Sequence, residues 1–171
     1  MSYYQVMDSY VLTRARGAEL LGEPPNTTRL LVDADATDHV MNAVRTTLGP
    51  GTDGPPPHFH KQSPEMFFLI DGALRVLAGE EILTLGAGDF LLIPPFMTHA
   101  WGTPPDRGAD ILIVKAPGNN RFDYFRLGDR IRRGEASPAE VLATQEKFDN
   151  HFVTSEVWRA TGQRVIALPG S

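Results

Sequence analysis

Three histidines and one glutamate constrain the fold of this chain more than any other feature: His58, His60, Glu65 and His99. His58 and His60 are two positions apart, so on a β-strand their side chains point to the same face. Glu65 follows a short turn and begins what we expect to be the next strand. His99 comes from a third segment, which only a folded barrel or sandwich can bring close. The pattern therefore predicts an all-β fold built around one metal site.

The donor types restrict the metal without identifying it. Imidazole suits iron, cobalt, nickel, copper and zinc, and a carboxylate extends the range towards manganese. We expect one divalent first-row transition metal ion, namely nickel, cobalt, manganese or iron. The chain has no cysteine, so disulfides, thiolate catalysis and cysteine-zinc sites are excluded.

Length and charge limit the remaining classes of function. With 171 residues, 42% of them hydrophobic, residues 1–171 are expected to form a single domain with one core. The net charge of −5 gives no indication of a nucleic-acid partner. The N-terminal residues show no signal pattern and no apolar run reaches membrane-spanning length, so we expect a cytoplasmic protein without a membrane partner.

Short apolar segments separated by glycine and proline favour a β-sandwich or barrel. The 16 glycines and 14 prolines fall largely between these segments, including a predicted turn at Asp71-Gly72. The expected strands cover residues 29–32, 39–48, 58–60, 65–70, 73–78, 81–85, 90–93, 99–101 and 111–115.

The segment after Pro117 has a different character, with an amphipathic stretch over residues 120–134. Ser137 to Glu140 form a capping box with proline at the first helical position, which predicts a helix from Pro138 to about Phe148. A further short helix is expected within residues 150–160. The predicted layout is a barrel core at about 28–117, an N-terminal arm, and a helical C-terminal extension at about 118–165.

The spacing of the candidate ligands resembles the first motif of the cupins, G-x5-H-x-H-x(3–4)-E-x6-G. His58, His60, Glu65 and Gly72 match this motif, whereas Thr52 stands at the leading glycine. The resemblance implies a jelly-roll β-barrel in which the two histidines and the glutamate bind the metal.

The second cupin motif, G-x5-P-x-G-x2-H-x3-N, is also similar to a segment of this chain. Gly88, Pro94 and His99 match in register, while Phe96 replaces a glycine and Thr103 replaces an asparagine. Both changes fall in a turn or at a strand end, so the resemblance keeps His99 as the fourth ligand.

Other segments look like those of bacterial single-domain quercetinases: residues 10–17, 63–68, 122–125 and 148–152. This resemblance implies a quercetin 2,3-dioxygenase, an oxidoreductase in which the metal binds a deprotonated flavonol. Dioxygen would then cleave the heterocycle with loss of carbon monoxide. The partners implied are a small planar aromatic substrate, dioxygen, and a second copy of the chain in a homodimer.

Glu65 is the only carboxylate that the motif places beside the metal, so we expect it to act as a ligand and as the general base. A flat aromatic substrate requires an apolar pocket. Strand parity places two side chains with Glu65 and one with His99, and aromatic residues of the C-terminal extension are positioned to close the barrel mouth. The candidate substrate contacts are Phe67, Leu69, Trp101, Tyr124, Phe125 and Phe152.

Two alternatives remain open from the sequence. A metal-assisted polyketide cyclase or isomerase that needs no dioxygen requires the same apolar pocket and the same Lewis acid. A non-enzymatic cupin that binds a small ligand would show binding without turnover. Dioxygen consumption distinguishes the dioxygenase from both alternatives.

Overall fold

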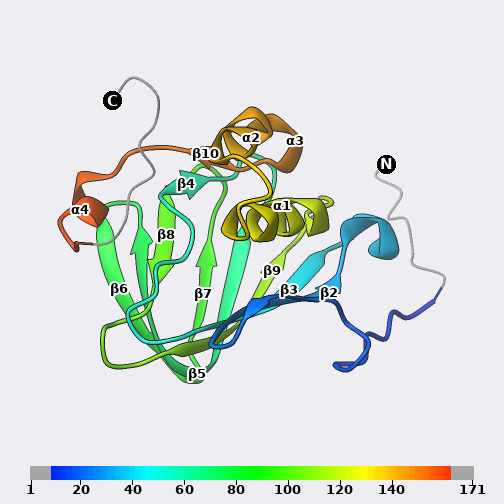
Figure 1. The fold of residues 1–171 in the computed structure, drawn as a ribbon, viewed down its shortest axis with the longest axis horizontal. Coiled ribbons are helices and arrows are strands. Elements are labelled where there is room, and N and C mark those ends of the chain that lie inside the picture. The colour runs from blue at the N-terminus through cyan, green and yellow to red at the C-terminus, as the bar shows by residue number, and fades with distance from the viewer. Residues whose placement is uncertain (1–8, 163–171) are drawn as a thin grey trace.

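The computed structural model describes residues 9–162, which form a strongly curved antiparallel sheet with short helices gathered at one end (Figure 1). The strands are β1 (Leu20–Glu23), β2 (Asn26–Val32), β3 (Asn42–Leu48), β4 (His58–Phe59), β5 (Glu65–Ala78), β6 (Glu81–Gly86), β7 (Phe90–Ile93), β8 (His99–Gly102), β9 (Ala109–Lys115) and β10 (His151–Phe152). The helices are the 3-10 helix η1 (Ala34–Thr37) and the α-helices α1 (Phe122–Arg132), α2 (Pro138–Ala143), α3 (Gln145–Phe148) and α4 (Glu156–Arg159). No helix within residues 9–162 is long and apolar enough to cross a membrane.

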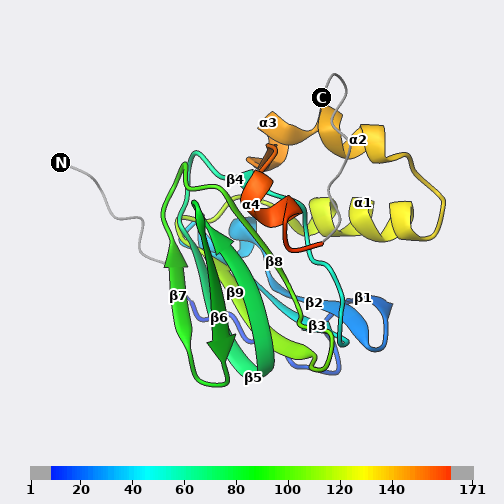
Figure 2. The same ribbon diagram turned by 90° about the vertical axis from the view of Figure 1, so that its left-hand side faces the viewer.

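The strands follow the order β1-β2-β3-β9-β5-β8-β4-β10, and β6 and β7 both pair with β5. The first half of β5 lies between β7 and β9, and its second half lies between β6 and β8. One strand therefore belongs to both walls, which closes the sheet into the predicted all-β cupin jelly-roll barrel (Figure 2).

The continuity of β5 corrects the prediction of two strands separated by a turn at Asp71-Gly72. The ladder with β9 shifts register between Leu69 and Asp71 and then continues. Gly72 has φ +88°, and a Cβ there would clash with the carbonyl oxygen of Gly108. The glycine thus marks a β-bulge with close backbone approach, and the bend that it allows turns β5 from one wall into the other.

The barrel interior is filled by alternate residues of the strands. In β9 every second residue is buried, and in the first half of β5 Glu65, Phe67 and Leu69 face inward. A smaller apolar cluster lies on the other face of the sheet, where Trp158 of α4 packs on Leu77 and Ala100. Burial on both faces explains why every residue of β8 is buried.

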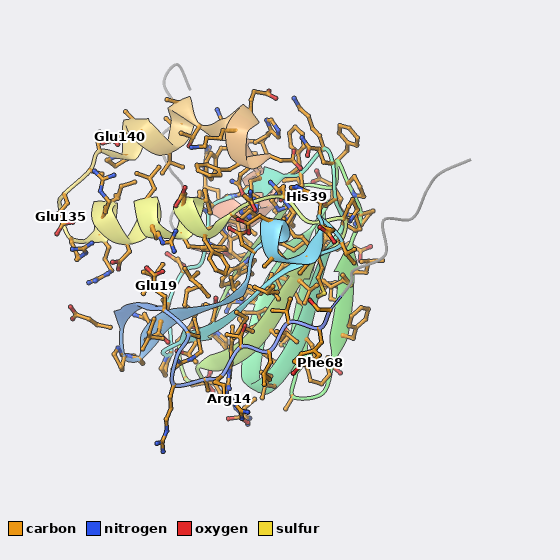
Figure 3. All side chains as sticks on the ribbon, turned by 90° about the vertical axis from the view of Figure 1, so that its right-hand side faces the viewer. Arg14, Glu19, His39, Phe68, Glu135 and Glu140 are labelled. Atoms are coloured by element: carbon orange, nitrogen blue, oxygen red, sulfur yellow. The ribbon has the colours of Figure 1, made fainter. Side chains whose placement is uncertain are left out.

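Helix α1 is held in place at both of its ends. The carboxylate of Asp33 accepts hydrogen bonds from the backbone N–H groups of Arg121 and Phe122, at 2.8 and 3.1 Å. Near the other end, Asp129 accepts a hydrogen bond from Gly22 in β1, at 3.1 Å. Glu19, labelled in Figure 3, bonds Arg126 of the same helix at 2.7 Å. These bonds fix α1 against the N-terminal strands.

The C-terminal extension differs from its prediction in three respects. The expected helix from Pro138 to Phe148 has the predicted capping box but is interrupted at Thr144, so it forms α2 and α3. The helix expected within residues 150–160 is only α4, and β10 precedes it. Phe152 therefore lies on a strand that pairs with β4, not on a helix. Residues 163–165 of the predicted extension lie outside the described residues.

Candidate metal centre

The four predicted ligands meet inside the barrel, although three separate strands carry them. His58 lies in β4, His60 directly follows it, Glu65 begins β5, and His99 begins β8, where it is paired with His58. Their potential ligand atoms all lie within 4.8 Å of one another, and all four residues are buried. The donors are close enough together for a single ion to bind all of them.

The backbone orients each imidazole. The Nδ1 atoms of His58 and His99 lie 2.8 and 3.0 Å from the carbonyl oxygens of Pro56 and Met97. The Nδ1 atom of His60 lies within hydrogen-bond distance of the carbonyl oxygen of Asp149. A carbonyl only accepts, so each Nδ1 carries the proton and each Nε2 presents a lone pair to the centre.

The resulting arrangement of lone pairs fits a cation. Oε2 of Glu65 lies 2.9 Å from Nε2 of His99 and 3.3 Å from Nε2 of His60. A carboxylate oxygen and two deprotonated nitrogens repel one another at these distances unless a positive charge lies between them. The residues therefore fit a metal ion such as nickel, cobalt, manganese or iron, and their donor types do not select one of these.

The surroundings of the candidate ligands favour the protonation states that metal binding requires. Burial lowers the pKa of His58 well below its ordinary value and lowers the pKa of His60 to about 4. Burial acts to raise the pKa of Glu65, but a proton shared with His60 or His99 outweighs this in the metal-free site and holds the pKa well below its ordinary value; a bound ion would take the place of that proton. Neutral imidazoles and an ionised carboxylate are the forms that bind a divalent ion.

A cavity of about 210 Å³ adjoins the centre. Both apolar and polar side chains surround it, and His58 and Glu65 connect it to the ligand cluster. Its lining residues are Thr28, Thr46, Leu48, Pro55, His58, Glu65, Trp101, Ile113, Arg121, Tyr124, Phe125 and Asn150.

The structure divides the six candidate substrate contacts. Trp101 of β8 and Tyr124 and Phe125 of α1 line the cavity. Phe67 and Leu69 have no exposed surface and belong to the barrel core, so they do not line it. Phe152 also lies outside the lining, with its ring 6.1 Å from that of His58.

Four polar residues near the centre were not identified as site residues from the sequence: Lys115, Arg121, Asp149 and Asn150. Each is almost fully buried. Lys115 is opposite Glu65 in the pairing of β9 with β5, and burial lowers its pKa to about 7. Asp149 accepts hydrogen bonds from the backbone N–H groups of residues 61 and 62, directly after the ligand strand. The available signal in the sequence was that these polar residues fall at or next to the ends of strands and helices.

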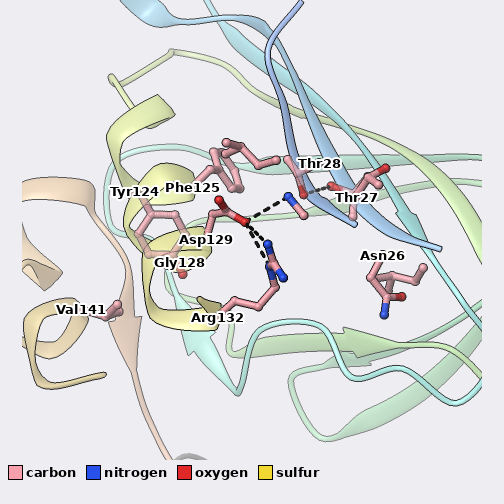
Figure 4. A pocket seen from close by; sticks show the side chains of 13 residues that line it. Asn26, Thr27, Thr28, Tyr124, Phe125, Gly128, Asp129, Arg132 and Val141 are labelled. Atoms are coloured by element: carbon pink, nitrogen blue, oxygen red, sulfur yellow. Dashed lines mark hydrogen bonds and ion pairs between the residues drawn. The ribbon is translucent and has the colours of Figure 1, made fainter. Parts of the chain in front are cut away.

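A second pocket, of about 270 Å³, lies between β1 and α1 (Figure 4). Figure 4 shows Asp129 and Arg132 bonded to each other at its wall. Five residues line both this outer pocket and the inner cavity: Thr28, Thr46, Leu48, Tyr124 and Phe125. The metal cavity and the outer pocket therefore adjoin each other at these side chains.

Comparison with known proteins agrees with this fold and centre. Residues 44–115 match the sequence model of the Cupin domain (Cupin_2). This segment contains all four candidate ligands. No curated protein sequence matches the chain.

Several solved structures share the fold at low sequence identity. An RmlC-like cupin from Shewanella frigidimarina has a TM-score of 0.54 and 19% identity, over 68% of this chain and 96% of that one. The polyketide cyclase RemF from Streptomyces resistomycificus has a TM-score of 0.53 and 18% identity, over 67% and 87%. The Streptomyces nucleoside dehydratase Pac13 has a TM-score of 0.52 and 15% identity, over 67% and 88%. The chain therefore has the cupin fold.

Proposed function

We propose that this protein is a metal-dependent cupin enzyme that catalyses a proton-transfer reaction without dioxygen, such as cyclisation, dehydration or isomerisation of a small organic substrate. The observation that carries the proposal is the cavity that ends at His58 and Glu65. It offers a substrate direct access to the side chains that bind the ion.

The size of the cavity supports a small substrate. Its volume of about 210 Å³ is below the roughly 300–1,000 Å³ typical of pockets for drug-sized ligands. One or two rings are a better match than a flavonol with three. Two proteins with this fold are named as a polyketide cyclase and a nucleoside dehydratase, and neither name implies dioxygen as a substrate.

When bound, the divalent ion supplies a Lewis acid that polarises a substrate oxygen. The three imidazoles hold it in their neutral form. Glu65 directs Oε2 towards His60 and His99 and also lines the cavity, so we assign proton removal to its second oxygen, Oε1. Trp101, Tyr124 and Phe125 exclude water and orient a flat substrate by ring contact.

The second candidate is a quercetin 2,3-dioxygenase that opens a flavonol with dioxygen. The aromatic lining favours it, because Trp101, Tyr124 and Phe125 present ring faces or edges to the same cavity. A three-ring substrate would also need part of the outer pocket. Dioxygen uptake therefore separates this candidate from the first.

The test compares protein loaded separately with nickel, cobalt, manganese or iron. Under argon in D₂O, we expect metal-dependent deuterium incorporation next to the carbonyl of small hydroxycarbonyl compounds such as 3-hydroxycyclohexanone. Under air, oxygen uptake with loss of quercetin absorbance and release of carbon monoxide would select the second candidate. Absence of both activities in fully loaded protein would contradict an enzymatic function and favour a ligand-binding protein.

A further inference from the structure

One wall of the metal cavity is polar and buried, and metal ligation does not account for it. Arg121 and Asn150 form this wall with exposed fractions of 4% and 1%. They are joined to each other, because Nη2 of Arg121 donates to Oδ1 of Asn150 at 3.2 Å. The Nδ2 group of Asn150 is buried and has no hydrogen-bond partner among the described residues. A buried N–H donor without a partner is costly unless a ligand satisfies it.

The charge of Arg121 is also uncompensated by a direct partner. Its Nη1 donates to the carbonyl oxygen of Phe148 at 2.7 Å, and its guanidinium lies 4.6 Å from the ring centre of Tyr124. Within residues 9–162, no carboxylate forms an ion pair with it at 4.0 Å or less. Buried arginine is normally paired with an anion.

The charges around the centre also favour an anionic ligand. The buried carboxylates Glu65 and Asp149 carry two negative charges, against one positive charge on Arg121 and at most one on Lys115, whose Nζ lies 4.0 Å from Asp149. A bound divalent ion therefore gives the centre a net positive charge in a region that water does not screen well. An anionic group on the substrate would neutralise that charge and remove the desolvation cost.

We propose that the substrate carries a carboxylate, which Arg121 and Nδ2 of Asn150 bind at the wall of the metal cavity. This inference rests on the proposed function, since it describes the substrate of the same site. The guanidinium and the amide supply N–H donors suited to a planar carboxylate. Arg121 and Asn150 are thus specificity-determining residues, and the reacting part of the substrate lies nearer Glu65 and the ion.

The experiment uses benzoate and its neutral analogue benzamide, both planar and small enough for the cavity, in calorimetric titrations of metal-loaded and metal-free protein. Wild-type protein should bind benzoate at least ten-fold more tightly than benzamide. Asn150→Asp gives Arg121 a carboxylate partner without removing the guanidinium, so it should weaken benzoate binding at least ten-fold and leave benzamide unchanged. Arg130→Gln, at an exposed arginine of α1, changes the net charge by the same amount as Asn150→Asp and should have no effect.

Asn150→Leu is the second variant, because it removes the free N–H donor without adding a charge. It should weaken benzoate binding several-fold even if Asn150→Asp does not fold. Equal binding of benzoate and benzamide to the wild type would overturn the proposal. Benzoate binding that requires the metal and is unchanged in both Asn150 variants would place the anion on the ion, which also overturns it. Metal-dependent deuterium exchange of a neutral substrate would still support the proposed function in either case.

Discussion

The barrel strands and the C-terminal extension contribute differently to the site. Strands β4, β5 and β8 and the residue after β4 supply all four candidate ligands, and the Cupin-domain match at residues 44–115 includes them. The extension after residue 117 supplies Arg121, Tyr124, Phe125 and Asn150 to the cavity. The candidate metal site is thus a property of the barrel, whereas much of the cavity wall belongs to a segment outside the matched region. Two proteins can therefore share the candidate ligands of the barrel and differ in the cavity wall that the extension supplies.

The largest effect should follow from removing a barrel ligand. His99→Ala deletes one of the four candidate donors, and we expect the metal affinity to fall by at least about 100-fold, since loss of a supporting residue alone typically costs 10–100-fold. Metal content after dialysis, measured by mass spectrometry, checks this. His39→Ala is the matched control, because His39 is exposed and should leave the metal content unchanged. Full metal occupancy in His99→Ala would show that metal binding does not depend on the four candidate ligands of the barrel.

Glu65→Gln separates ligation from catalysis within the barrel region. The amide keeps an oxygen donor but cannot accept a proton, so we expect most of the metal to remain and the rate to fall by roughly 10²–10⁴-fold. Deuterium exchange of a small hydroxycarbonyl compound, normalised to metal content, provides the measurement. A rate close to that of the wild type would limit Glu65 to ligation and leave the general base unassigned.

The buried histidines should make the metal-free protein sensitive to acid. The pKa of His60 is about 4 in the folded state and near 6.5 when unfolded, so only the unfolded chain gains a proton between these values. The free energy of unfolding is therefore fully retained above pH 6.5 and falls as the pH approaches 4, by on the order of 3 kcal/mol from His60 alone. Denaturant unfolding at several pH values tests the slope. His60→Asn should make the free energy of unfolding depend less on pH. An unchanged slope would contradict the assignment of this acid sensitivity to His60.

The cluster of four candidate metal ligands was predictable because its members obey local rules. His58 and His60 share a strand face at a separation of two, and Glu65 and His99 follow at family spacings, so no tertiary contact had to be known. The turn at Asp71-Gly72 was wrongly predicted because the same dipeptide also occurs at a β-bulge, and here pairing with β9 continues through it. The residue pattern alone does not distinguish a tight turn from a β-bulge.

The wall formed by the extension was not predictable for a different reason. Arg121 reaches the cavity because Asp33, far away in sequence, holds the start of α1, and because Phe148 and Asn150 accept its hydrogen bonds. Each of these contacts joins segments brought together only by the fold. Parity arguments placed Phe67 and Leu69 on the inward face correctly, but the same face also forms the core, and only the structure separates core from cavity.

The smallest expected effect tests whether the extension sets the size of the site. Phe125 lines both the metal cavity and the outer pocket, so Phe125→Ala should join the two spaces without touching a ligand. We expect metal content to stay constant, benzamide to bind about ten-fold more weakly through lost ring contact, about 1.4 kcal/mol, and quercetin to bind more tightly than in the wild type. Phe90→Ala, an exposed aromatic residue of β7, is the control. If quercetin binds the wild type tightly and Phe125→Ala weakens it, the cavity already admits three rings, and the dioxygenase becomes the better account of this extension.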